Sequence, residues 1–355
     1  MDSLLKILED RLGNDLPFVV YRLPGEDTLV YMAGMVEQLT SHQAVIPPGF
    51  LMAPFDSNET SWFMHAEEYR WENLAAPVTP EVSAEMIPRL LRPDDRQQHE
   101  QKVSAAVTAI RQGLLKKVVL SRKELTVFEQ PLSEVLRTLL NLYPSAFCYW
   151  WFHPETKSWM GASPELLLET RGSSFKSVSL AGTQEYLGNL DVKWGDKERE
   201  EQQIVTEYIM DQLQPVTRAV SRETASTVRA GRLLHLKTKI KGEMRTEGWQ
   251  PLVAKLHPTP AVCGYPTEVA RKYILEHEGY EREFYTGYLG PVGFEMNPLD
   301  HLALFVNLRC MKIDGEQATV FVGGGITADS VPEKEWEEIE AKSSTMMKVL
   351  ANSVI

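Results

Sequence analysis

Hydrophobic residues in the first fifth of the chain alternate with polar ones in short runs. FVVYRL, TLVYMAG, GFLMAPFD and SWFMHAEEY lie between about Pro17 and Trp71, and Gly, Pro, Asp and Asn separate them. Such runs are typical of antiparallel strands joined by turns. They predict a strand meander, and acids spaced among the leucines of the first 15 residues predict a short amphipathic helix before it.

A helical spacing of apolar positions replaces this alternation after about residue 94. Apolar residues three and four apart predict a helix over 94–115. Further helices are expected over 131–142, from about 196, over 249–256, over 266–277 and from about 333, with strands over 117–122, 147–152, 177–183, 233–244 and 302–308. No repeat, low-complexity segment or clean linker interrupts them, so we expect one domain over residues 1–355.

Three consecutive glycines follow a predicted strand near the C-terminus. Ala318–Val322 leads into Gly323, Gly324 and Gly325, and a helix is expected to begin at about Glu333. Glycines after a strand let the backbone approach a bound group closely, and their N–H groups can cradle an anion. The stretch therefore predicts a ligand-binding device.

The helix after these glycines carries charged residues beside its apolar stripe. Glu335, Glu338 and Lys342 lie within about 60° of one another when drawn at 100° per residue. Charges at the edge of a buried stripe need partners, which a divalent metal and an anionic ligand would supply. The alternative is a solvated face in which Glu338 and Lys342 pair across one helical turn.

Two residues have the character of an acid–base pair. Strand alternation points Lys116 and Lys117 to opposite faces, so one of them is expected to face inward, where a desolvated lysine can act as a base. Glu165 lies between a Ser-Pro bend and an apolar strand, where its surroundings should raise its pKa and suit it to donate a proton. The alternatives are a lysine that snorkels from a strand end and a hydrogen-bonded structural acid.

Other candidate ligand contacts are single residues. Gly182 and Thr183 end a strand in a small-residue turn, and His257 lies in a proline-rich turn. Glu201 falls on the apolar stripe of the helix that begins near residue 196, so it either binds a cation or is a helix-dipole acid. Together with Glu338 it suggests Mg²⁺, because this ion prefers carboxylates and no His/Cys spacing favours zinc.

Composition limits the function classes. The chain has 355 residues, of which 43% are hydrophobic and 24% are charged, and its net charge of −12 argues against nucleic acid as the main partner. It has neither a signal-peptide pattern nor an apolar run of membrane length. Three widely spaced cysteines, Cys148, Cys263 and Cys310, are expected to be reduced thiols in a cytoplasmic protein.

Nine stretches, taken in order, resemble the chorismate-utilising enzymes. They are KVVLSR, GASPELLL, SLAGT, KEREEQQIV, HPTPAVCG, FYTGYLG, NLRC, FVGGGI and EWEEIEAK. The resemblance covers residues 94–355 and leaves residues 1–93 as a variable N-terminal region. It implies an α+β fold in which two large, mainly antiparallel sheets face each other, with helices outside and the site between the sheets.

Two positions indicate which reaction the resemblance implies. Lys117 stands where amine-transferring members of the family carry Gln, and Ala181 stands where aminodeoxychorismate synthase carries a nucleophilic Lys. Both indicate water as the nucleophile, and therefore isochorismate synthase activity in menaquinone or siderophore synthesis, without a glutaminase subunit. Salicylate synthase is the alternative, and a non-catalytic binding module would require the loss of groups that are present. Monomers are common in the family.

The resemblance also implies a role for each candidate residue. Glu201 and Glu338 would hold Mg²⁺, with Glu335 acting through water. The ring carboxylate of chorismate would contact Gly182 and Thr183. Lys117 would activate water and Glu165 would protonate the departing hydroxyl. The residues implied for the pyruvyl carboxylate and the ring are Tyr285, Arg309, Gly323, Lys342 and His257.

Overall fold

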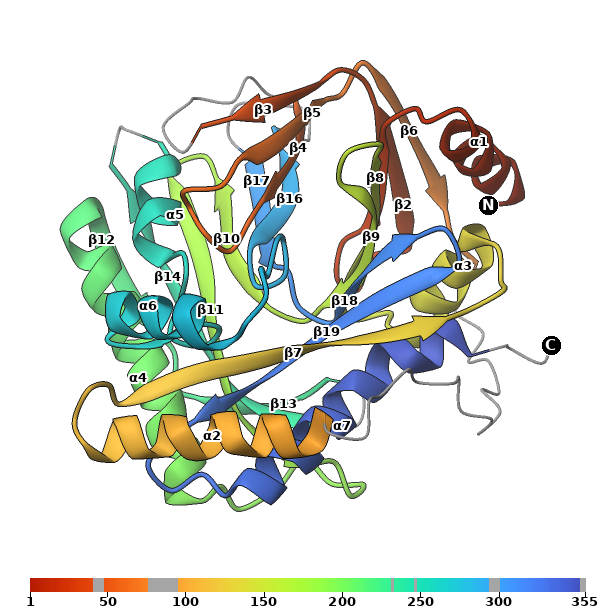
Figure 1. The fold of residues 1–355 in the computed structure, drawn as a ribbon. Helices are drawn as coiled ribbons and strands as arrows, with labels where there is room; N and C mark the ends of the chain where they lie inside the picture. Colours follow the sequence, from red (N-terminus) through yellow and green to blue (C-terminus); the bar gives the residue numbers. More distant parts are fainter. Residues whose placement is uncertain (41–47, 76–94, 231–232, 246–247, 294–300, 352–355) are drawn as a thin grey trace.

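Two antiparallel sheets form the centre of the molecule (Figure 1). The computed structural model describes residues 1–40, 48–75, 95–230, 233–245, 248–293 and 301–351. In order, the nine-stranded sheet consists of β15 (Gly264–Tyr265), β7 (Lys117–Val127), β19 (Gln317–Ile326), β18 (Cys310–Asp314), β9 (Lys157–Ser163), β8 (Phe147–His153), β1 (Phe18–Arg22), β2 (Thr28–Ala33) and β6 (Glu68–Asn73).

The second sheet has ten strands, and nine of them follow one continuous order. It consists of β12 (Thr217–Arg222), β14 (Leu233–Met244), β11 (Ser174–Glu185), β10 (Leu166–Arg171), β17 (His301–Val306), β16 (Tyr288–Val292), β4 (Gly49–Ala53), β5 (Ser61–His65) and β3 (Val36–Leu39). The tenth strand, β13 (Ser226–Ala230), lies outside this order and pairs with β14.

The inner faces of the two sheets pack against each other through aromatic side chains. Phe147 of β8 stacks on Phe305 of β17, with ring centroids 4.2 Å apart. The same cluster includes Trp151 and Trp159 from one sheet and Phe50 from the other, all buried. Buried aromatic side chains contribute a large apolar area, so this cluster holds the sheets face to face.

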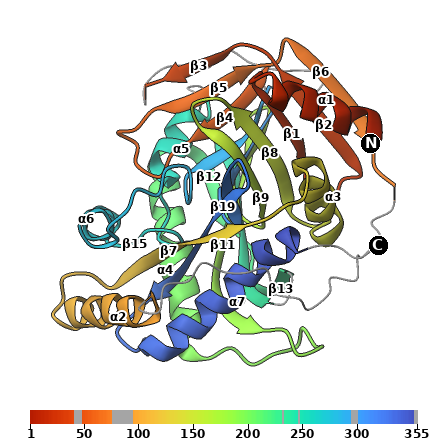
Figure 2. The same ribbon diagram turned by 45° about the vertical axis from the view of Figure 1, so that its right-hand side comes forward.

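Helices cover the outer faces, as the resemblance implies (Figures 1 and 2). They are α1 (Asp2–Gly13), α2 (Asp95–Arg111), α3 (Leu132–Leu142), α4 (Asp196–Leu213), the 3₁₀ turn η1 (Gln214–Val216), α5 (Gln250–Leu256), α6 (Thr267–His277) and α7 (Pro332–Leu350). Both views show α2 and α7 side by side next to β7 and β19. None of the described helices is long and apolar enough to cross a membrane.

The predicted N-terminal meander is wrong in one respect, although its strands are present. β1, β2 and β6 join the nine-stranded sheet, whereas β3, β4 and β5 join the ten-stranded sheet. All residues of β1 and β4 are buried, so both faces of these strands are covered. Alternation identifies a strand, but it does not tell which of two stacked sheets the strand joins.

Candidate active site

A pocket of about 90 Å³ lies where strands of both sheets meet α4 and α7. β7 and β19 supply one wall, while β11 and β14 supply another. The lining includes eight of the residues singled out in the sequence: Glu165, Gly182, Thr183, Glu201, Tyr285, Arg309, Gly323 and Lys342. Elements far apart in the chain thus bring the sequence candidates to one place.

Lys117 lies at the start of β7 and is the inward-facing lysine of its pair. Its side chain is fully buried, whereas Lys116 is exposed. Lys117 Nζ lies 2.8 Å from Glu201 Oε1, a contact between β7 and α4. Burial raises the pKa of Glu201, but Lys117 and the more distant lysines outweigh burial and leave that pKa below its usual value.

Gly325 leaves room for this ion pair. A Cβ atom at position 325 would lie 2.7 Å from Glu201 Oε1 and 3.0 Å from Lys117 Cε. Both distances are shorter than a normal van der Waals contact. The absence of a side chain on β19 therefore allows the Lys117–Glu201 contact.

The predicted end of the strand at Val322 is wrong, because the three glycines continue strand β19 to Ile326. Gly323, Gly324 and Gly325 stand opposite Ser121, Leu120 and Val119 of β7. The glycines instead give space to neighbouring side chains: a Cβ atom at Gly323 would lie 2.8 Å from the Tyr285 hydroxyl. Lys342 Nζ donates to the Gly323 carbonyl over 3.2 Å.

Glu165 occupies the connection between β9 and β10, where the chain passes from one sheet to the other. The residue is 3% exposed, and its backbone N–H donates to the hydroxyl of Ser163. Burial raises the pKa of its carboxyl to about 8, and Lys117 offsets part of that rise. Glu165 is therefore mostly protonated at neutral pH and able to donate a proton.

Arg309 presents a desolvated positive charge to the pocket. Its Nη1 donates to Thr345 Oγ1 over 2.7 Å, and burial lowers the pKa of the guanidinium. In the part of the chain that the structure describes, no carboxylate forms an ion pair with it. A partly buried cation without a counter-ion favours an anionic ligand.

Each of the three predicted metal ligands is paired with a lysine. Glu201 contacts Lys117, Glu338 Oε1 lies 2.6 Å from Lys342 Nζ, and Glu335 Oε1 lies 3.0 Å from Lys197 Nζ. Among the described residues, no three acids are already arranged around one point as metal ligands.

The acids of α7 nevertheless fit a hard cation. Glu335 is 2% exposed, and its Oε2 is buried and makes no hydrogen bond with described residues. Burial and the nearby Glu338 raise the pKa of this carboxyl. Burial lowers the pKa of Lys197, but Glu335, Glu338 and Glu201 together outweigh burial and raise it, so all three acids act on this lysine. Carboxylate oxygens gathered around one positive charge form a donor set that suits Mg²⁺.

The histidine in the pocket is His235, which the sequence analysis missed. His257, the predicted ligand contact, is not part of the pocket lining: its Nε2 lies 3.2 Å from the Phe55 carbonyl oxygen and its ring packs on Tyr288. His235 Nδ1 lies 3.0 Å from the Gly182 carbonyl oxygen, and burial lowers the pKa of the imidazole to about 3. The only sequence signal was a lone histidine in the alternating strand 233–244.

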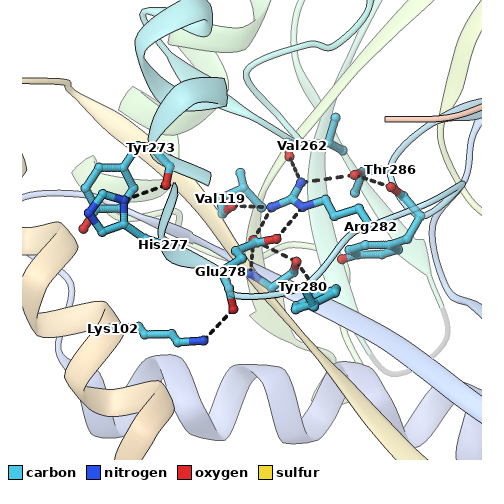
Figure 3. Close-up of polar contacts among 11 residues, drawn as sticks. Lys102, Val119, Val262, Tyr273, His277, Glu278, Tyr280, Arg282 and Thr286 are labelled. Atoms are coloured by element: carbon cyan, nitrogen blue, oxygen red, sulfur yellow. Dashed lines mark hydrogen bonds and ion pairs between the residues drawn. The ribbon is translucent and has the colours of Figure 1, made fainter. Parts of the chain in front are cut away.

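A buried ion pair behind the pocket was also missed (Figure 3). The Arg282 guanidinium binds Glu278 through two nitrogens. It also donates to the carbonyls of Val119 (2.8 Å) and Val262 (2.9 Å) and to Thr286 Oγ1 (3.1 Å). The last three residues line the pocket. An E-x-x-x-R spacing was the available signal, and surface helices carry the same spacing.

This pair completes the hydrogen bonding along the edge of β7. The partner strand β15 is only two residues long and pairs with Lys117 and Val118 of β7. Beyond it, Glu278 Oε1 accepts hydrogen bonds of 2.8 Å from both the N–H and the hydroxyl of Ser121, and Arg282 binds the Val119 carbonyl. The two side chains thus take the place of a longer strand and fix one pocket wall.

The chain is similar to known proteins over most of its length. Residues 55–351 match the family described as "Chorismate binding enzyme", so the match begins earlier than the predicted residue 94. Isochorismate synthase DhbC of Bacillus subtilis is 29% identical over 84% of this chain and 79% of its own length. Isochorismate synthase MenF of Escherichia coli is 29% identical over 76% of this chain and 65% of its own length.

Solved structures show the same fold. The crystal structure of DhbC from Bacillus anthracis has a TM-score of 0.80 and 26% identity, and the alignment covers 97% of this chain and 100% of that one. The structure of MenF from E. coli has a TM-score of 0.77 at 21% identity, covering 94% and 88%. The chain belongs to the family of chorismate binding enzymes.

Proposed function

We propose that this chain is an isochorismate synthase, an isomerase that converts chorismate to isochorismate. The observation that carries the proposal is that the acid Glu165, whose pKa is raised to about 8, lines the same pocket as Glu201, and Glu201 contacts the fully buried Lys117. Water addition at C2 with loss of the C4 hydroxyl needs one group that accepts a proton and one that donates a proton. Relatives named isochorismate synthase support the same reaction.

The proposed reaction balances without an added oxidant or reductant. The Lys117 amine takes a proton from water while the water oxygen bonds to C2. The C1=C2 double bond shifts to C1=C6, the C5=C6 double bond shifts to C4=C5, the C4–O bond breaks, and Glu165 gives its proton to the departing oxygen. One water enters and one leaves, so the product is an isomer of the substrate.

The remaining pocket residues would bind the two carboxylates of chorismate. Arg309 and Lys342 supply positive charge for the pyruvyl carboxylate, with the Tyr285 hydroxyl beside Gly323. Gly182 and Thr183 stand at the opposite sheet, where they would contact the ring carboxylate. A planar guanidinium suits a carboxylate because it can donate two parallel hydrogen bonds.

Glu201, Glu338 and Glu335 are the proposed ligands of Mg²⁺. When bound there, the ion would neutralise charge on the ring carboxylate. The lysines that pair with these acids in the structure would then have to release them.

We also propose that the chain is a single domain over residues 1–355, a monomer and a cytoplasmic protein. The three free, buried cysteines suit a reducing compartment.

The test of the proposed roles compares two neighbouring lysines. Lys117→Ala should lower isochorismate formation by about 10²–10⁴-fold, the usual contribution of a positioned base. Lys116→Ala, on the exposed face of the same strand end, should leave the rate unchanged. Equal rates for the two variants would remove Lys117 from the mechanism.

A further inference from the structure

A second cavity adjoins the pocket. It has a volume of about 550 Å³ and shares Pro164, Leu180 and Arg309 with the pocket. Pro144 and Ser145 on its lining are exposed, whereas Leu180 is buried. The cavity therefore extends from exposed residues to the pocket wall.

Positive charge lines this cavity. Arg229 of β13, Lys237 of β14 and Arg309 all face it, and none of its described lining residues is acidic. The Arg229 guanidinium stacks over the Tyr186 ring, 4.0 Å from its centroid, which holds the charge in place. Three cations without an acid among them create a positive potential inside the cavity.

Lys237 gives the strongest indication that the second cavity binds an anion. The side chain is half-buried, and within the described ranges no carboxylate forms an ion pair with it. Its neighbour Lys239 lies near Glu223, which also pairs with Lys241. Burial lowers the pKa of Lys237, and Lys239 lowers it further, so the charged ammonium is held at a cost that a bound anion would offset.

The net charge of −12 gives such a region a role in the approach of an anionic substrate. A dianion approaching this protein is repelled on average, and a locally positive entrance reverses the sign of that interaction. We propose that the second cavity is the entrance through which a dicarboxylate substrate reaches the pocket, with Arg229 and Lys237 attracting it and Arg309 receiving it. This inference rests on the proposed function.

The test removes the entrance charges and leaves the proposed catalytic groups in place. Arg229→Gln/Lys237→Gln is compared with Lys272→Gln, which removes one charge from a side chain on α6 that is 75% exposed. At an ionic strength of about 0.02 M, the double variant should raise KM for chorismate by about three- to tenfold with kcat unchanged. At about 0.3 M the difference should shrink, because salt screens charges across open solvent. Lys272→Gln should behave as wild type at both ionic strengths.

A binding measurement separates failure of the entrance from failure of the proposed function. Isophthalate, a stable planar dicarboxylate, is titrated calorimetrically into the wild type and the double variant at both ionic strengths. If isophthalate binds the wild type several-fold more tightly than the double variant at low salt, the proposed entrance is supported. If chorismate is not turned over in that case, only the proposed function fails. Equal isophthalate affinities of the wild type and the double variant, or a KM of the double variant equal to that of Lys272→Gln, would refute the proposed entrance.

Discussion

Replacing Arg282 with methionine removes all five N–H donors of a buried guanidinium. The side chains of Arg282 and Glu278 are 2% and 1% exposed. Burial lowers the pKa of Arg282, but Glu278 outweighs burial and raises it above its ordinary value. The substitution leaves the Glu278 carboxylate buried without its main counter-ion and leaves the carbonyls of Val119 and Val262 without this donor.

The expected cost follows from the loss of one partner of a buried pair. Such a change lowers the free energy of unfolding by about 3–5 kcal/mol, a large part of the ~5–15 kcal/mol of a typical domain. Glu278→Leu should cost a similar amount because it leaves the guanidinium unpaired. The double variant should cost about 2–3 kcal/mol less than the sum of the two single variants, because it leaves no unpaired charge.

The assay is urea unfolding followed by tryptophan fluorescence. The matched control is the Arg96–Glu100 pair, which has the same spacing of four residues. Arg96 Nε lies 2.7 Å from Glu100 Oε1, but the Arg96 side chain is 53% exposed. Arg96→Met should leave the urea midpoint nearly unchanged, because exposed ion pairs contribute little to stability. If Arg282→Met costs as little as Arg96→Met, or if the two single costs add in the double variant, the Arg282–Glu278 pair does not hold this wall of the pocket.

Three further predictions concern the pocket. Glu165→Gln should lower the rate by about 10²–10⁴-fold. Since the wild-type carboxyl has a pKa of about 8, activity should fall as pH rises through 8 and the proton is lost. The folded state also binds this proton more tightly than the unfolded state, so stability should decline between about pH 4.5 and 8, and the decline should be smaller in Glu165→Gln unfolding curves. Gly325→Ala should nearly abolish turnover by displacing Glu201, whereas Gly13→Ala, with no atom within 4 Å of its added Cβ, should not change the rate. Glu201→Gln should weaken the Mg²⁺-induced rise in Tm and the Mg²⁺ dependence of the rate together, and an unchanged thermal shift would remove Glu201 from the metal site.

The sequence predicted much of the site because several of its residues conflict with their local pattern. Glu201 interrupts an apolar helical stripe, and Lys117 begins an apolar strand; both are charges in places where a charge is costly without a partner. The structure places them 2.8 Å apart. Local patterns therefore identified the residues, while only the fold showed that they meet.

The features that the sequence missed depend on partners distant in the chain. His235 looks like any histidine in a strand until β14 pairs with β11 and sets it opposite Thr183. Glu278 and Arg282 look like a surface helix pair. Only the fold shows that the short β15 pairs with Lys117 and Val118 alone, so that these two side chains bind the edge of β7 beyond it. The strand was predicted to end before the glycine run because glycine is depleted in strands, and local propensity does not reveal the eleven-residue strand β7 alongside it.

The most direct test of the central claim is identification of the product formed from chorismate. The purified protein is incubated with chorismate and Mg²⁺, and the products are separated by chromatography, with EDTA added in a parallel sample. We predict isochorismate, formed only in the sample that retains the metal. Salicylate with pyruvate would identify a salicylate synthase instead, and unchanged chorismate would contradict the proposed function.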